Sequence, residues 1–178
     1  MKHFVGIVGN NWSGSRNRQL LQLMKRRYAD QFDLTLLETG DLPLFSQDIE
    51  TTPSPVVTAF RDQIAQADGI IIATAEHNHS IPTSLKNALD WCSRVVHPID
   101  QQPVMLVGAS LGPMGTVRAQ MHLRQILDSP GIGARVLPSN EVLISFSGKQ
   151  FTPEGDITNP ATLAQLDLST QAFMAFVG

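Results

Sequence analysis

Three short segments of the chain combine polar side chains with glycine in a way that suits the binding of a small ligand. They cover residues 9–17, 75–82 and 109–116. Each follows a run of apolar, strand-forming residues, so each is expected to be a loop at the end of a buried strand. One such loop is a weak indication, because ordinary turns have the same composition. Three loops that meet at one edge of a sheet would be a stronger one.

The first segment is small and polar and is expected to run directly into a helix. The free N–H groups and the positive dipole end of a helix N-terminus bind phosphate. Hydroxyls at Ser13 and Ser15 and the amide of Asn17 would add donors. Neither G-x-x-x-x-G-K-[ST] nor G-x-G-x-x-G is present. The alternative is a plain capped loop with Ser15 as the N-cap, and the residues alone favour neither reading.

The second segment offers many backbone N–H and C=O groups beside polar side chains, which suits the edge of a planar heterocycle. His77 and His79 also suggest a metal ion, but a metal site needs a third ligand held nearby and none is evident. We therefore predict no metal. An exposed surface loop is the alternative.

The third segment contains glycines that would let a ligand approach the backbone closely, and its alternative is an ordinary turn. A nucleophilic site is not expected elsewhere. Residues 108–112 (GASLG) match Gly-x-Ser-x-Gly, but no convincing Ser-His-Asp or Cys-His set accompanies them, so no α/β-hydrolase is predicted. Cys92 follows Trp91 late in an expected helix, so we predict a buried thiol and not a nucleophile.

Length and composition favour one compact domain over residues 1–178. The net charge of −3 gives no electrostatic footprint for nucleic acid. The longest apolar run, residues 69–75, is far too short for a membrane span, and the N-terminal apolar run is too short for a signal peptide. A single cysteine excludes an intrachain disulfide and fits a reducing compartment. We expect a cytoplasmic protein with no nucleic-acid or membrane partner.

Apolar, β-rich runs alternate with helical patterns along the whole chain. Alternation predicts an α/β fold with parallel strands, right-handed crossovers and helices on both faces. In such a sheet with strand order 2-1-3-4-5, ligands bind beyond the carboxyl ends of strands 1 and 3. We expect an exposed loop at 147–159, strands at 4–8, 32–37, 69–74, 103–108 and within 135–145, and helices at 15–28, 55–67, 82–94, 115–127 and 160–176.

The three segments also carry the motifs of a known family. Its first block, roughly G-S-x-R-x-x-S-x-N, is matched at Gly9, Ser15 and Asn17, with Asn10 where serine is usual and Trp12 where arginine is usual. Its second block, P-E-Y-N-x-S-x-P-x-x-L-K-N-A-x-D-W, is matched by AEHNHSIPTSLKNALDW at 75–91. Its third block, a glycine-rich loop followed by R-A-Q-x-x-L-R, is matched at 112–124. In these blocks the chain resembles the NAD(P)H-dependent FMN reductases, which include quinone, chromate and azo reductases.

The resemblance implies a flavodoxin-like fold with a five-stranded parallel sheet and FMN as cofactor. NADH or NADPH would be the hydride donor, and a flavin, quinone, azo compound or metal oxyanion the acceptor. Flavin chemistry demands no catalytic side chain, so none is predicted. Family members are usually homodimers or homotetramers. The implied FMN-binding residues are Gly9, Asn10, Trp12, Ser13, Ser15, Arg16 and Asn17 around the phosphate, Glu76, His77 and Asn78 along the ring, and Ser110, Gly112 and Gly115 at its other edge.

Departures from the family pattern bear on the site, and those at Asn10 and Trp12 keep a decayed cofactor site open as an alternative. Trp12 removes a charged phosphate donor, which would weaken FMN binding about ten- to a hundredfold unless Arg16 supplies the charge. Trp12 would alternatively cover the site as an apolar lid. His77 puts an imidazole where the family has tyrosine. The alternatives to a reductase are a flavodoxin-type electron carrier and a protein of this fold whose site has decayed into a regulatory role.

Overall fold

The computed structural model describes residues 1–178 and contains one parallel β-sheet with the order β2-β1-β3-β4-β5. Every strand pairing is parallel. The predicted α/β class and strand order are therefore confirmed. The strands are β1 (Lys2–Val8), β2 (Phe32–Glu38), β3 (Gly69–Ala73), β4 (Pro103–Ala109), β5 (Arg135–Val136) and β6 (Val142–Ile144).

The last strand of the sheet differs from the prediction of one strand within 135–145. It is split into β5 and β6, which both pair with β4. Pro138 between them has no N–H to donate to the ladder. Arg124 donates to the carbonyl oxygens of Leu137 and Asn140 at 3.1 and 3.0 Å, which keeps these groups paired without a continuous strand.

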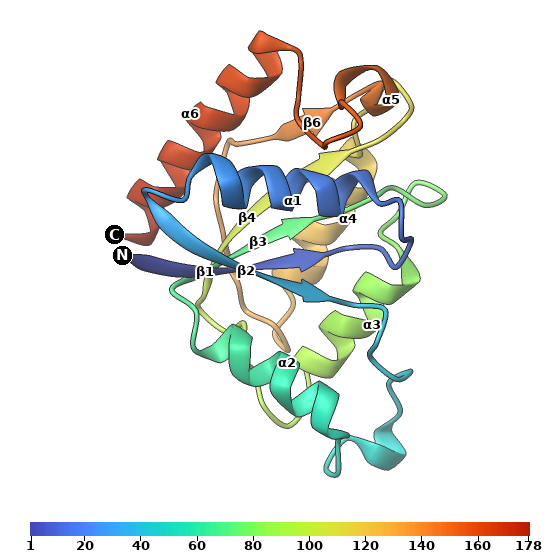
Figure 1. Cartoon of the computed structure of the whole chain (residues 1–178). Helices are drawn as coiled ribbons and strands as arrows, with labels where there is room; N and C mark the ends of the chain where they lie inside the picture. Colours follow the sequence, from blue (N-terminus) through green and yellow to red (C-terminus); the bar gives the residue numbers. More distant parts are fainter.

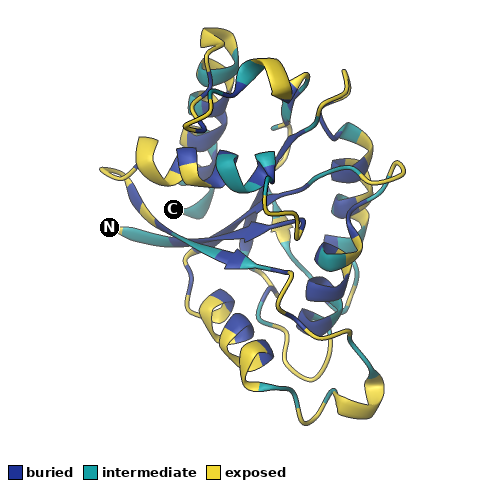
Figure 2. Ribbon diagram, turned by 45° about the vertical axis from the view of Figure 1, so that its right-hand side comes forward, coloured by how far each residue is buried: buried dark blue, intermediate teal, exposed yellow.

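The helices cover both faces of the sheet, as Figure 1 shows. Helices α1 and α6 lie on one face, and α2, α3 and α4 lie on the other. The core residues are buried along the strands and along the inner sides of the helices, which show as dark blue in Figure 2. The helices are α1 (Arg16–Arg27), η1 (Gln47–Ile49), α2 (Pro55–Ala65), α3 (Thr83–Cys92), α4 (Val117–Leu127), α5 (Ser147–Gln150) and α6 (Pro160–Val177).

The segment after β6 is exposed over much of its length, as its Gly, Pro and Asp content predicted, but it is not a plain loop. It begins with the short helix α5, and Phe151 and Ile157 then form an isolated antiparallel bridge. Both of these apolar side chains are buried in the core cluster that also contains residues of α1 and α6. The burial of two large side chains outweighs the turn-forming composition around them. This segment therefore has a fixed position at the carboxyl end of β6.

The parallel order places the carboxyl ends of all the strands at one edge of the sheet. The two chain termini lie near the opposite edge (Figure 1). The loops that follow β1, β3 and β4 are consequently neighbours. None of the helices combines the length and the apolar character needed to cross a lipid bilayer.

Candidate cofactor-binding site

The three loops after β1, β3 and β4 surround one crevice with a volume of about 350 Å³. The structure brings together eight of the residues expected from the sequence, and four others complete the lining. Gly9, Ser13, Ser15, Asn78 and Gly115 do not line it. The expected lining residues are Asn10, Trp12, Arg16, Asn17, Glu76, His77, Ser110 and Gly112, and the added ones are Ala75, Ala109, Leu111 and Ser147.

Two residues of the first loop, Gly9 and Ser15, have structural roles within the protein. The Ser15 hydroxyl accepts the backbone N–H of Arg18 at 3.1 Å and donates to Asn10 Oδ1 at 2.5 Å. Ser15 is thus the N-cap of α1, as the capped-loop alternative required. A Cβ at Gly9 would lie 2.5 Å from the carbonyl oxygen of Ala73, so this glycine is needed where β1 passes β3. The capping role and the strand contact account for Ser15 and Gly9 without a ligand.

The amide of Asn17 joins the first loop to the third. Its Oδ1 accepts the N–H of Ala109 at 2.8 Å, and its Nδ2 donates to the carbonyl oxygen of Ala109 at 3.1 Å. Asn17 is buried. Its side chain is therefore a clamp between two loops of the crevice, with both polar atoms already paired.

Arg18 supports the first loop from outside and was not anticipated from the sequence. Its Nη1 donates to the carbonyl oxygens of Trp12 and Ser13 at 2.8 and 3.2 Å. Its other nitrogens donate to Glu38 at 2.7 Å, and this carboxylate raises the pKa of Arg18. The backbone N–H groups of Arg16 and Asn17 meanwhile have no acceptor within the protein. The loop therefore presents free donors at the start of a helix.

The aromatic side chain of Trp12 and the cationic side chain of Arg16 both belong to lining residues of the crevice. Trp12 is 62 % exposed, and its ring lies against Gly14, where a Cβ would be 2.6 Å from it. Arg16 donates to Gln19 Oε1 at 2.8 Å and forms none of the ion pairs of the structure. Arg16 is thus a cation without a carboxylate partner at the crevice.

Glu76, which the resemblance places along the flavin ring, lines the crevice and also caps a helix. Its Oε2 accepts the backbone N–H groups of Arg118 and Ala119 at 3.0 and 3.2 Å. The N-cap residue of α4, Thr116, has φ 74° and makes no side-chain cap, so Glu76 supplies one from another loop. The same carboxylate lies 3.7 Å from the Arg118 guanidinium, which explains a cation at a helix start.

The loop after β3 ends in a two-residue hairpin turn. The N–H and C=O groups of His77 and Ser80 pair at 2.9 and 3.0 Å, and Asn78 and His79 have φ values of 51° and 65°. Two successive positive φ values define a type I′ turn. Asn78 and His79 are exposed at its tip. No group of three or more His, Cys, Asp or Glu residues is placed to hold a metal ion.

The glycines of the loop after β4 have separate roles. Gly115 has φ 56°, and a Cβ there would lie 2.7 Å from the Leu143 backbone, so its role is in packing. A Cβ at Gly112 would meet nothing within 4 Å, so this glycine leaves open space at the crevice. Ser110 donates from its backbone N–H to Ile144 at 2.9 Å and so holds the loop on β6.

Cys92 takes no part in this site. It is fully buried, and burial raises the pKa of its thiol to about 12. The predicted burial of this thiol is confirmed.

The chemistry of the crevice fits a phosphorylated, flat ligand. Free N–H groups at the start of α1 and the Arg16 cation suit an anion. Ser147 is also among the lining residues, and its buried hydroxyl oxygen has no hydrogen-bond partner. Backbone of the β3 and β4 loops lies across from these donors, with open space at Gly112.

A sequence comparison decides what kind of protein presents this crevice. The profile of a family described as NADPH-dependent FMN reductase matches residues 3–149. The chain belongs to this family. It is a flavodoxin-like oxidoreductase whose cofactor is FMN and whose electron donor is a reduced nicotinamide.

Individual relatives of this FMN reductase agree with the assignment. NADH:(hydroxy)cinnamate reductase subunit CrdA of Vibrio ruber is 44% identical over 174 residues, which cover 98% of this chain and 86% of that protein. NADH-dependent flavin reductase subunit 2 of Lactobacillus johnsonii is 39% identical, with 97% and 96% covered. The solved flavoenzyme NAD(P)H:(acceptor) oxidoreductase FerB of Paracoccus denitrificans superposes with a TM-score of 0.90 at 26% identity, covering 99% and 97% of the two chains.

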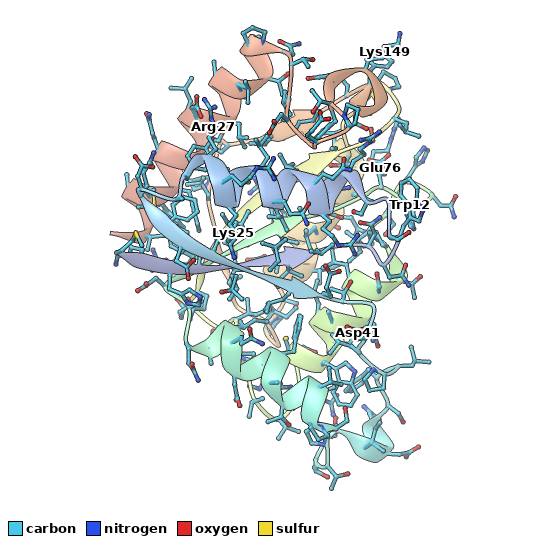
Figure 3. All side chains as sticks on the ribbon, viewed as in Figure 1. Trp12, Lys25, Arg27, Asp41, Glu76 and Lys149 are labelled. Atoms are coloured by element: carbon cyan, nitrogen blue, oxygen red, sulfur yellow. The ribbon has the colours of Figure 1, made fainter.

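The FMN reductase is viewed with its side chains in Figure 3. The labelled side chains of Trp12 and Glu76 lie at the same end of the molecule, whereas Lys25 and Arg27 lie toward the other end of α1. The two labelled crevice residues come from different loops, after β1 and β3. They mark the carboxyl edge of the sheet, where the crevice lies.

Proposed function

We propose that this reductase binds FMN in the crevice, with the phosphate at the start of α1 and the ring along the β3 and β4 loops. One domain over residues 1–178 would carry the whole site. The observation that carries the proposal is the meeting of three distant loops around one hollow of about 350 Å³. Ligands of open α/β sheets bind at this position, beyond the carboxyl ends of strands beside the switch in strand order.

The side chains around the crevice bind and orient the cofactor, because bound FMN supplies the electron transfer between a nicotinamide and an acceptor. Arg16 and the first-turn N–H groups of α1 compensate the phosphate charge. Asn17 and Arg18 hold the first loop in place through the carbonyls of Ala109, Trp12 and Ser13. Backbone groups at Glu76 and His77 and at Ser110 and Gly112 contact the ring edges.

The acceptor in this proposal is a small, flat oxidant such as a flavin, a quinone, an azo compound or a hydroxycinnamate. The mouth of the crevice is open and carries exposed Trp12 and Leu111, at 62 % and 73 %. Apolar side chains of this kind favour aromatic substrates over hydrated oxyanions. The Vibrio ruber relative, whose name specifies a (hydroxy)cinnamate, supports an aromatic acceptor.

A combined binding and turnover experiment tests the proposal. FMN is titrated calorimetrically, and the loaded protein is then mixed with NADH or NADPH and a benzoquinone. We expect one FMN per chain and nicotinamide oxidation faster than with free FMN. Binding without turnover would instead support the electron carrier, and absence of FMN binding would support the decayed site.

We also propose that the reductase works as a homodimer or homotetramer in the cytoplasm. The printed names of the Vibrio ruber and Lactobacillus johnsonii relatives each describe a subunit, which supports assembly. Sedimentation equilibrium of the FMN-loaded protein measures the state, with two or four chains expected. A monomer of 19.4 kDa at micromolar concentration would contradict this part of the proposal.

A further inference from the structure

The loop after β3 is fastened to helix α4 at two points, one on each side of His77. Before His77, the Glu76 carboxylate accepts two backbone N–H groups of the first turn of α4. After it, the Ser80 hydroxyl and His122 Nδ1 share a hydrogen bond of 2.8 Å. His122 lies one helical turn beyond the groups that Glu76 caps, so both contacts fall on the same side of α4. The stretch from Glu76 to Ser80 is therefore held at both ends.

The turn between these two points has a backbone conformation that side chains other than glycine adopt at a cost. Asn78 and His79 both have positive φ values, 51° and 65°, and glycine is the usual residue at the second of these positions. Such a conformation persists where the surrounding structure holds it. The backbone bridge across the turn is one such restraint, and the bond to His122 is the one side-chain hydrogen bond that the turn makes.

The turn bears on the site because its first residue lies at the crevice. Glu76 and His77 are lining residues, whereas Ser80 and His122 are not. His122 is exposed and Ser80 is half-buried, so a hydrogen bond between them adds little to the stability of the folded chain. Its consequence is for the position of the backbone at Glu76 and His77.

We propose that His122 is a positioning residue for the flavin ring. Through Ser80 it holds the turn on α4, so that the backbone of Glu76 and His77 stays where the edge of the ring requires it. The inference rests on the proposed function, because it takes FMN to occupy the crevice with its ring at this loop. His122 itself lies outside the crevice and acts only through Ser80.

The test compares FMN with riboflavin, which has the same ring system but no phosphate. Both ligands are titrated calorimetrically into wild type, Ser80→Ala and His122→Phe, which keeps a flat ring but has no nitrogen. We expect both Kd values to rise by the same factor, about three- to tenfold, because the ring is common to the two ligands. The Tm of the ligand-free variants should stay within about 2 °C of that of wild type.

Further variants separate positioning from a purely structural role. His122→Asn keeps a hydrogen-bonding group near the place of Nδ1 and should restore both Kd values to within about twofold of wild type. The double variant Ser80→Ala/His122→Phe should bind no more weakly than either single variant, because both changes remove the same bond. The matched control is His97→Phe, with unchanged binding expected: His97 Nδ1 also makes an exposed hydrogen bond, at 2.7 Å to the carbonyl oxygen of Gly131, away from the crevice.

Several results would overturn the inference. Weaker binding of FMN alone would place the effect at the phosphate, and unchanged binding of both ligands in Ser80→Ala and His122→Phe would show that the contact positions nothing. Losses that multiply in the double variant, or a fall in Tm of more than about 5 °C, would show separate or structural roles. Failure of wild type to bind either ligand would instead contradict the proposed function itself.

Discussion

Buried polar groups occur both where α2 and the 42–45 segment pack against α3 and at the crevice beyond the carboxyl ends of the strands. The two regions differ in whether these groups have hydrogen-bond partners within the protein. In the first region, Arg61 of α2 and Asn87 and Trp91 of α3 form a group that we name the α3 cluster. Each of these side chains has a hydrogen-bond partner within the protein. Asn87 accepts the N–H of Phe45 at 2.8 Å, and Trp91 donates to Pro43 at 2.7 Å. In the crevice, the Arg16 cation has no carboxylate and the Ser147 hydroxyl has no partner at all.

The difference indicates that the α3 cluster stabilises the fold, whereas the crevice residues serve binding. Paired polar groups fix the 42–45 segment against α3 and leave no donor for a ligand. Unpaired donors in the crevice cost stability until a ligand meets them. Variants of the two regions should therefore separate stability from FMN affinity.

The largest expected effect is a loss of stability in Arg61→Ala. Arg61 is 5 % exposed, and its guanidinium donates to the carbonyl oxygens of Trp91 and Arg94 at the end of α3. Burial lowers the pKa of Arg61, and the cation lies 5.4 Å from the Trp91 ring centre. Removing it should lower the free energy of unfolding by about 3 kcal/mol, measured in urea.

The Arg61 variant separates stability from FMN affinity only if it leaves FMN affinity unchanged. The affinity for FMN, measured below the unfolding transition, should stay within about twofold of wild type. An exposed control, Arg26→Ala, should lose less than about 1 kcal/mol. A large loss of FMN affinity in Arg61→Ala would mean that the two regions are coupled.

Asn17→Ala should affect both properties, because Asn17 belongs to the crevice but is paired as fully as the α3 cluster. The variant loses two buried hydrogen bonds to Ala109, so we expect unfolding to be easier by about 2 kcal/mol. FMN should bind about tenfold more weakly, since the first and third loops are no longer joined. Loss of stability with full FMN affinity would contradict a positioning role for this clamp.

The smallest expected effect is a pH dependence at the surface contact between α1 and α6. The Arg27 guanidinium donates to Asp167 at 2.7 Å and holds the pKa of that carboxyl below its ordinary value. A depressed carboxyl pKa stabilises the fold above the unfolded value, near 4, and this contribution is lost as the pH falls through the folded pKa. Both side chains are about one-third exposed, so the contribution should be below about 1 kcal/mol.

Asp167→Asn provides the measurement for this contact. Its stability should fall less than that of wild type between about pH 4 and pH 2 in urea titrations. FMN affinity at pH 7 should not change. Parallel pH profiles of the two proteins would contradict the assigned ion pair.

The parts of the fold that the sequence predicted are those with a strong local pattern. Residues 69–74 form a continuous apolar run, and β3 is buried throughout. The Ser15 cap of α1 and the proline start of α6 follow from single residue types with fixed roles. The segment at 147–159 was predicted only in part, because the buried Phe151 and Ile157 join a core cluster whose other residues lie far away in the chain.

The candidate site also contains features that the sequence predicted and features that it did not. Its loops were predicted because polar residues follow recognisable strands at the expected edge. The capping of α4 by the Glu76 carboxylate was not predicted, since this contact exists only in the folded chain. Ser147 was missed for a similar reason: nothing in the sequence around it signals that it lies at the crevice.

The measurement that tests the account most directly is a calorimetric titration of FMN and riboflavin into wild type and Trp12→Arg. If the loop after β1 holds the phosphate, the restored guanidinium should tighten FMN about ten- to a hundredfold and leave riboflavin unchanged. An FMN constant that is unchanged or weaker in Trp12→Arg would mean that the phosphate does not lie at this loop, and the three-loop crevice would lose its cofactor.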